Sequence, residues 1–335
     1  MSSTPGSPQP WLASQLSDLL KQRGHAWLLH GPSGLGQYSL ALELAKAWLC
    51  EAKGPAGACG KCTSCHAIDV HSHADLCVLM PEVQQLALGW PLSEKAQSEI
   101  DDKKRKASKE IRIEAMRDAV EFAQRTSARG LGKVVLVYPA EQMNTVTANA
   151  LLKTLEEPAG DMRFVLASES VHQLLPTIRS RCISHAMVWP NEAVARDWLM
   201  DQGVPQKAAA ACLRMTGNRP DDALALSLSE AQFWDSAEFV RAMMQGQALM
   251  VKDWSVPRLL DQLQKLCHDC MAVSVMAKPR FFELGTVPQG LSMRVLNDWS
   301  KALAALRNHM DHPFQQGLAQ EALVAQAQSA LNSKF

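Results

Sequence analysis

The sequence is short of tyrosine, of net charge and of long apolar runs. Only two of its 335 residues are tyrosine, and its 34 Lys and Arg balance its 34 Asp and Glu. A balanced charge excludes a global field that attracts nucleic acid, so any such contact must come from a local patch or from a partner. No apolar run approaches the roughly 20 residues that a membrane-spanning helix needs, so we expect no membrane segment.

The N-terminal stretch MSSTPGSPQP also lacks the basic and apolar regions of a secretory signal. We therefore expect a cytoplasmic protein with reduced cysteines, and metal binding rather than disulfides where its nine cysteines cluster. The hydrophobic content of 47% is typical of a soluble globular protein, and the length favours two or three domains.

Short apolar runs alternate with amphipathic segments in the first half of the chain. The predicted strands are 26–30, 74–81, 133–140, 163–169 and 183–190, and the predicted helices are 39–50, 111–126 and 144–158. Such alternation predicts a parallel sheet that is covered by helices on both faces. After Pro190 only helical patterns follow.

This change of pattern predicts three domains. They are an α/β domain over 1–190, which includes a cysteine-rich segment at 50–65 and a polar insertion at 82–110, a small helical lid over 191–230, and an all-α C-terminal domain over 231–335. The insertion contains the basic run KKRKASK. A solvated, disordered loop is the ordinary interpretation of such a run, and DNA contact is the sharper alternative, although neighbouring acidic residues dilute its charge.

A cysteine cluster is the strongest metal-binding signal in the chain. The pattern C-x8-C-x2-C-x2-C is formed by Cys50, Cys59, Cys62 and Cys65. Four thiolates on a short loop suit tetrahedral Zn²⁺, and a closed shell of four leaves no open position, so the predicted role is structural. An iron–sulfur cluster and loose surface thiols are the alternatives.

Two further groups of side chains have weaker claims to a metal. His66, His71 and His73 could each replace one thiolate, but four cysteines already satisfy the ion. A second C-x2-C pair, Cys267 and Cys270, lies inside an apolar helical run. That position favours two small buried side chains over a metal site.

Residues 31–39 read GPSGLGQYS and follow a predicted strand, as a phosphate-binding loop does. The glycines that outline this loop are Gly31, Gly34 and Gly36. A working loop places Lys and then Ser or Thr after its last glycine, to neutralise the phosphates and to hold Mg²⁺. Here Gln37 and Tyr38 stand at those two positions.

The second half of a nucleotide-hydrolysing site is also missing. An apolar strand should end in acidic residues that hold Mg²⁺ and polarise water. The strand VVLV is followed instead by Tyr138 and Pro139, and Glu141 comes too late. ATP hydrolysis by this chain is therefore not expected. Weak nucleotide or phosphate binding at the helix N-terminus stays open, with a loop kept only as scaffold as the favoured interpretation.

The order of motifs resembles one known family. It is GPSGLGQYS, the cysteine cluster, KVVLVYPAEQMN at 133–144, NALLKTLEEP at 149–158 and IRSRC at 178–182. In this order the chain is similar to the delta-prime subunits of bacterial DNA polymerase III clamp loaders, members of the AAA+ superfamily. The ATP-hydrolysing gamma/tau subunits share the cysteine module and NALLKTLEEP, so the degenerate positions at 37, 38, 138 and 139 separate the two groups.

The resemblance implies a role for Arg181 within Ser-Arg-Cys, as an arginine finger that reaches the ATP of a neighbouring subunit. A guanidinium is always charged and presents a fork of donors to phosphate oxygens. Arg179 lies nearby, and a surface salt bridge is its ordinary interpretation. Ser168 and Arg219 fall near the family's two sensor positions, where without catalytic machinery they are expected to be relics or packing residues.

The resemblance further implies an AAA+ domain with a helical lid and a C-terminal collar. Its partners are the gamma/tau and delta subunits, the beta sliding clamp and, through the complex, primed DNA. The whole holoenzyme is a DNA-directed DNA polymerase. The competing hypotheses are an active AAA+ ATPase with unorthodox ligands and a zinc-dependent module that binds nucleic acid.

Overall fold

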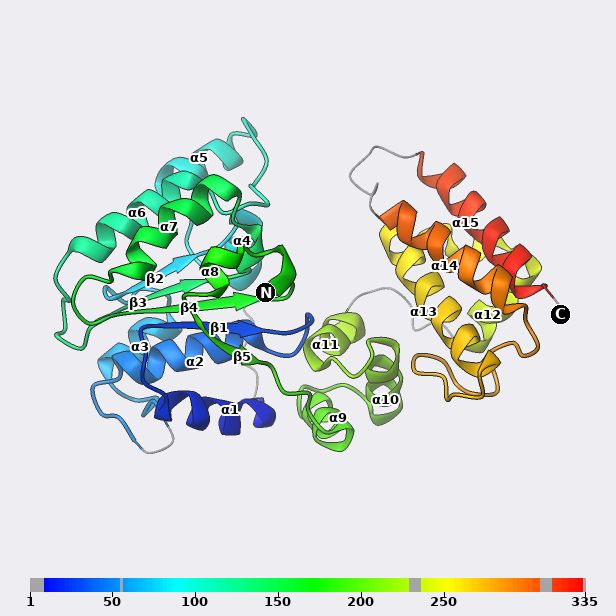
Figure 1. The fold of residues 1–335 in the computed structure, drawn as a ribbon, viewed down its shortest axis with the longest axis horizontal. Coiled ribbons are helices and arrows are strands. Elements are labelled where there is room, and N and C mark those ends of the chain that lie inside the picture. The colour runs from blue at the N-terminus through cyan, green and yellow to red at the C-terminus, as the bar shows by residue number, and fades with distance from the viewer. Residues whose placement is uncertain (1–8, 55–56, 229–235, 308–314, 334–335) are drawn as a thin grey trace. The chain divides into compact units, whose positions relative to one another are not determined.

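The computed structural model describes residues 9–54, 57–228, 236–307 and 315–333. The chain divides into two compact units, Met1–Val194 and Ala195–Phe335, which are described separately (Figure 1). Residues 1–8, which form most of the stretch searched for a secretory signal, lie outside the described residues. The predicted boundary near 230 lies outside them too, and the division into three domains stays a prediction.

A five-stranded parallel sheet forms the centre of the first unit. Its strands are β1 (Ala26–His30), β2 (Leu76–Leu79), β3 (Lys133–Val137), β4 (Met162–Ser168) and β5 (Ile183–Ala186), in the order β2-β3-β4-β1-β5. In the register, Trp27 of β1 pairs with Val165 on one side and with Ile183 on the other. Each predicted strand is present, and the predicted parallel α/β sheet is confirmed.

Helices cover both faces of this sheet (Figure 1). On one face lies α2 (Gln37–Leu49), with α1 (Pro10–Lys21) and α3 (Thr63–Asp69); on the other lie α6 (Ile113–Gln124), α7 (Thr145–Glu156) and the short α8 (Pro176–Arg179). Successive strand residues point to opposite faces. Leu28 therefore joins the core under α6 and α7, whereas the ring of Trp27 packs 4.7 Å from that of Trp48 in α2.

The insertion is folded, and its basic run at 103–109 lies in a loop, so the predicted loop is present but its predicted disorder is wrong. It contains α4 (Glu82–Leu88) and α5 (Glu94–Asp101). Arg105 of the basic run donates to both carboxylate oxygens of Glu82, at 2.5 and 2.8 Å, and to Glu99 at 2.6 Å. Arg105 thus holds the insertion together. Lys103, Lys104 and Lys106 remain exposed, and the predicted DNA contact stays a prediction.

The described part of the second unit is built mainly of α-helices. They are the rest of α9 (Glu192–Asp201), α10 (Gln206–Met215), α11 (Pro220–Leu228), α12 (Ser236–Gln245), α13 (Val256–Ser274), α14 (Met293–Arg307) and α15 (Gln316–Leu331). Phe239, Leu263 and Leu323 lie in one apolar core. Cys267 and Cys270 are buried in α13, so their predicted packing role is confirmed. No helix among the described residues combines the length and apolarity that crossing a bilayer requires.

Candidate functional site

Helix α2 has a candidate site at each end. The glycine-rich loop of 31–36 precedes its first residue, and Cys50 follows its last residue as the C-cap. Gly36 caps the helix N-terminus with φ +91°, and Gly34 has φ +76°. Side chains rarely adopt these left-handed angles, so the turn depends on glycine at both positions. The predicted strand, turn and helix are therefore all in place.

The side chain of Gln37 forms its hydrogen bonds within the glycine-rich loop. Its side chain is buried, and its amide nitrogen donates to the carbonyl oxygens of Gly31 at 3.0 Å and Pro32 at 2.6 Å. A lysine at this position would offer an ammonium group to a phosphate. The amide is neutral, and both of its N–H donors are used by the loop, so neither is left for an anion.

The two tyrosines of the chain meet beside this loop. The rings of Tyr38 and Tyr138 have their centroids 5.3 Å apart. Trp90 Nε1 donates to Tyr38 Oη at 2.6 Å, and Tyr138 Oη donates to Glu169 at 2.9 Å. Burial raises the pKa of Tyr38, and the hydrogen bond from Trp90 opposes this shift. An aromatic pair therefore stands at the sequence positions where oxygen ligands for Mg²⁺ were sought.

Neither Trp90 nor Glu169 belongs to a sequence motif that predicts a site. Trp90 is a large aromatic residue in a largely polar insertion, and this contrast is the feature of the sequence that could have indicated a role for it. Glu141, considered as a late acidic residue, accepts a hydrogen bond from the backbone N–H of Glu169 at 3.0 Å. Its carboxylate supports the turn after β4.

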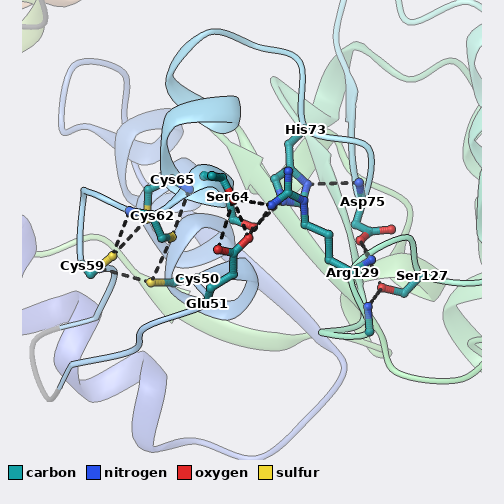
Figure 2. A network of polar contacts seen from close by, with 12 residues as sticks. Cys50, Glu51, Cys59, Cys62, Ser64, Cys65, His73, Asp75, Ser127 and Arg129 are labelled. Carbon is teal, nitrogen blue, oxygen red and sulfur yellow. Dashed lines mark hydrogen bonds and ion pairs between the residues drawn. The ribbon is translucent and has the colours of Figure 1, made fainter.

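The four predicted metal ligands converge at the other end of α2 (Figure 2). The Sγ atoms of Cys50, Cys59, Cys62 and Cys65 all lie within 4.8 Å of one another. The Cys50–Cys62 and Cys59–Cys65 Sγ pairs are each 3.9 Å apart. A tetrahedral ion with Zn–S bonds of about 2.3 Å separates its sulfur atoms by about 3.8 Å. The cluster can therefore hold a metal ion.

Backbone donors favour thiolates in this cluster. The N–H groups of Cys59 and Cys65 lie 3.2 and 3.4 Å from the Sγ atoms of Cys50 and Cys62, respectively. Burial opposes ionisation of Cys62, but N–H donors outweigh it and lower the pKa of its thiol to about 6. Burial raises the pKa of Cys65 to about 12. The thiolate is the ligating form, so Cys62 is already suited to bind an ion, whereas Cys65 would give up its proton on binding one.

Arg181 lies in the turn between α8 and β5. Its Nε donates to Glu156 at 2.7 Å, its Nη2 also pairs with Glu156, and its Nη1 donates to the carbonyl of Thr177 at 2.8 Å. The side chain is 33% exposed.

The two sensor-like residues have local partners. Ser168 is buried at the end of β4, and its hydroxyl accepts the backbone N–H of Ser170 at 3.2 Å. Arg219, in the second unit, pairs with Asp222 at 2.8 Å. Both contacts agree with the packing roles that were expected for these residues.

Comparisons with known proteins give one consistent family. The family model described as DNA polymerase III, delta subunit, matches residues 9–188. The chain is 38% identical over 216 residues to DNA polymerase III subunit delta' of Pseudomonas aeruginosa, covering 63% of this chain and 58% of that protein. It is 32% identical over 223 residues to the delta' subunit of Escherichia coli, covering 65% of this chain and 60% of that protein.

A second group of relatives is matched over a shorter stretch. The chain is 34% identical over 159 residues to DNA polymerase III subunit tau of Escherichia coli, covering 48% of this chain and 21% of that protein. The matched region thus spans about three fifths of the delta' relatives and a much smaller part of tau.

Proposed function

Because this chain belongs to the DNA polymerase III delta-subunit family, whose model matches residues 9–188, we propose that it is a clamp-loader subunit that does not hydrolyse ATP. The relatives named delta' confirm the resemblance that the sequence motifs predicted. In this proposal the chain assembles with gamma/tau and delta subunits and takes part in loading the beta sliding clamp onto primed DNA.

The observation that carries the proposal is the state of the glycine-rich loop. Gln37 donates to two carbonyls of that loop, and Tyr38 packs against Tyr138. Phosphoryl transfer needs a cation at the phosphates and carboxylates that hold Mg²⁺. The side chains at the expected positions supply neither the cation nor the carboxylates. This supports the proposal that the chain contributes to the reaction of a neighbouring subunit.

Arg181 is the group that we propose for this contribution. Its present partner is the carboxylate of Glu156, which is an anion as a phosphate is. A guanidinium binds either anion through the same planar fork of donors. In the assembly, Arg181 would exchange this partner for the ATP phosphates of an adjacent gamma/tau subunit and stabilise the charge of the transition state.

We further propose that the cysteine cluster holds a structural Zn²⁺. Its ligands would be Cys50, Cys59, Cys62 and Cys65, which converge on one point. The ion would supply a cross-link between the end of α2 and the start of α3, and no catalytic step. Such a cross-link stabilises a short loop that buries little apolar surface of its own.

The test replaces Arg181 in the reconstituted complex. Arg181→Ala should lower the DNA- and clamp-stimulated ATPase at the neighbouring site by about tenfold or more, since arginine fingers accelerate phosphoryl transfer by at least that factor. The complex should still assemble. Arg179→Ala is the matched control, because it removes an exposed arginine two positions away. Undiminished turnover in an intact Arg181→Ala complex would refute the finger role.

The competing ATPase hypothesis is tested on the purified chain alone. We expect no phosphate release above background with ATP and Mg²⁺. Turnover that disappears in Gln37→Ala would establish an active enzyme with unorthodox ligands and would overturn the proposal.

A further inference from the structure

A chain of hydrogen bonds begins at the cysteine cluster and runs inward (Figure 2). Ser64 Oγ donates to Glu51 Oε1 at 2.9 Å, and His73 Nε2 lies 3.2 Å from Ser64 Oγ. The backbone N–H of Asp75 donates to His73 Nδ1 at 3.0 Å, which fixes the ring proton on Nε2 and makes His73 the donor to Ser64. Ser64, His73 and Asp75 are all buried.

Asp75 extends this chain to the turn of residues 127–130, which leads into β3. Its carboxylate accepts hydrogen bonds from Ser127 Oγ at 3.0 Å and from the backbone N–H groups of Ala128 and Arg129 at 2.7 and 2.9 Å. Three donors on one buried carboxylate fix the turn firmly, because a lost partner would leave a buried charge unsatisfied.

Arg129 closes the chain into a ring. Its guanidinium forms an ion pair with Glu51 and donates to Thr63 Oγ1 at 2.6 Å. Glu51 directly follows Cys50, and Thr63 directly follows Cys62, so the guanidinium contacts the neighbours of two candidate ligands. Glu51 also accepts from Thr63 Oγ1 at 2.9 Å, which joins the two ligand segments to each other.

We propose that Arg129 is a positioning residue of the metal centre, and that it couples metal binding to the order of the 127–130 turn. The inference rests on the proposed metal-binding function of the cysteines. Residues outside the ligand shell orient the ligands, and their loss typically weakens metal affinity by about 10- to 100-fold. Here the orienting group comes from a segment remote in sequence, which is itself held by Asp75.

An exposed ion pair is ordinarily worth little, because two mobile side chains must be ordered to form it. The side chains of Glu51 and Arg129 are 38% and 36% exposed, but both residues are held by further hydrogen bonds. Glu51 is held by the hydroxyls of Thr63 and Ser64, and the backbone of Arg129 is held by Asp75. Forming this ion pair therefore costs less conformational entropy than forming an ordinary surface pair. Because the pair is still partly exposed, we place the effect of its loss on zinc affinity at the lower end of the range, about tenfold.

The experiment measures zinc affinity in the full chain by competition with a chromophoric chelator. Arg129→Gln should bind Zn²⁺ about tenfold more weakly than the unchanged chain. Arg125→Gln is the matched control. It removes the same charge four positions earlier in the chain, where Arg125 forms an exposed ion pair with Glu121. Arg129→Lys, which retains the charge but loses the fork, should lie between the two. Equal affinity in Arg129→Gln and Arg125→Gln would overturn the proposal.

Amide hydrogen exchange supplies a second readout. Stripping zinc from the unchanged chain should speed exchange at the N–H groups of Ala128 and Arg129, and in Arg129→Gln this dependence on zinc should shrink. If Arg129→Gln does not fold, Glu51→Gln breaks the same ion pair from its other side and should show the same affinity loss. A chain that binds no zinc at all refutes the proposed metal function, whereas zinc binding that ignores Arg129 refutes only this inference.

Discussion

The two ends of helix α2 differ in what balances their polar and ionisable groups. At the N-terminal end, Gln37 gives its donors to carbonyls of its own loop. At the C-terminal end, four sulfur atoms gather within 4.8 Å of one another. The side-chain donors of Gln37 are satisfied by the chain itself, whereas four ionised thiols at the second end would need a cation to balance their charge.

This difference indicates which of the two sites depends on its particular side chains. Where a loop is needed only for its turn geometry, neutral or aromatic side chains can occupy the positions that reactive side chains hold in a working loop. Four converging thiolates need a cation to balance their charge, and a neutral side chain does not supply one. One end of α2 should therefore tolerate substitution much better than the other, and three measurements test this comparison.

The largest effect is expected at the cysteine end. Cys65→Ser removes one ligand from a buried position, so the chain should lose its bound zinc and at least about 3 kcal/mol of its free energy of unfolding. Metal content and urea denaturation measure the two losses. Cys182→Ser is the control, because Cys182 lies outside the cluster and should leave zinc binding unchanged. Full zinc content in Cys65→Ser would contradict the assignment of this ligand.

The comparison also explains which features were predictable from sequence. The cysteine ligands lie within sixteen consecutive positions, 50–65, and the strands are continuous apolar runs, so local patterns were enough. The partners that close the degenerate loop are remote: Trp90 and Tyr38 are 52 positions apart. The ion pair between Glu82 and Arg105 likewise spans 23 positions, so no local pattern could predict the contact that orders the basic run.

Short helices were the other omission. Helix α3 has seven residues and α8 has four, too few to show an apolar period. Helix α3 is fixed by its N-cap, where Cys62 Sγ accepts the N–H of Cys65. Helix α1 has its apolar period in Trp11, Leu12, Leu16 and Leu19, directly after a proline-rich start, and no helix is predicted there from the sequence.

The second measurement addresses the loop end. Gln37→Ala deprives the carbonyls of Gly31 and Pro32 of a buried donor, which should cost about 1–3 kcal/mol of the free energy of unfolding. ATP turnover should stay at background in the variant as in the unchanged chain. Gln22→Ala, at an exposed position, is the control and should change stability by less than about 0.5 kcal/mol. A stability loss as large as that of Cys65→Ser would break the comparison.

The smallest effect concerns the protonation of Tyr38. Burial raises its pKa, so the folded chain holds the phenol proton more tightly than the unfolded chain does. The stability from this group is therefore complete below pH 10, the pKa of an unperturbed tyrosine, and is lost as the pH rises through the folded pKa. Because the chain has only two tyrosines, the ultraviolet absorbance of tyrosinate reports this site alone.

In Tyr138→Phe the absorbance isolates Tyr38, and its midpoint in the folded chain should lie above that of the same chain unfolded in denaturant. The N–H of Trp90 donates to Tyr38 Oη and stabilises the anion. Adding Trp90→Phe should therefore raise the midpoint further, because a donor to the charged form lowers a pKa. A midpoint that matches the unfolded chain would mean that Tyr38 is solvated, and the loop end of α2 would then be open where the aromatic pair is proposed to close it.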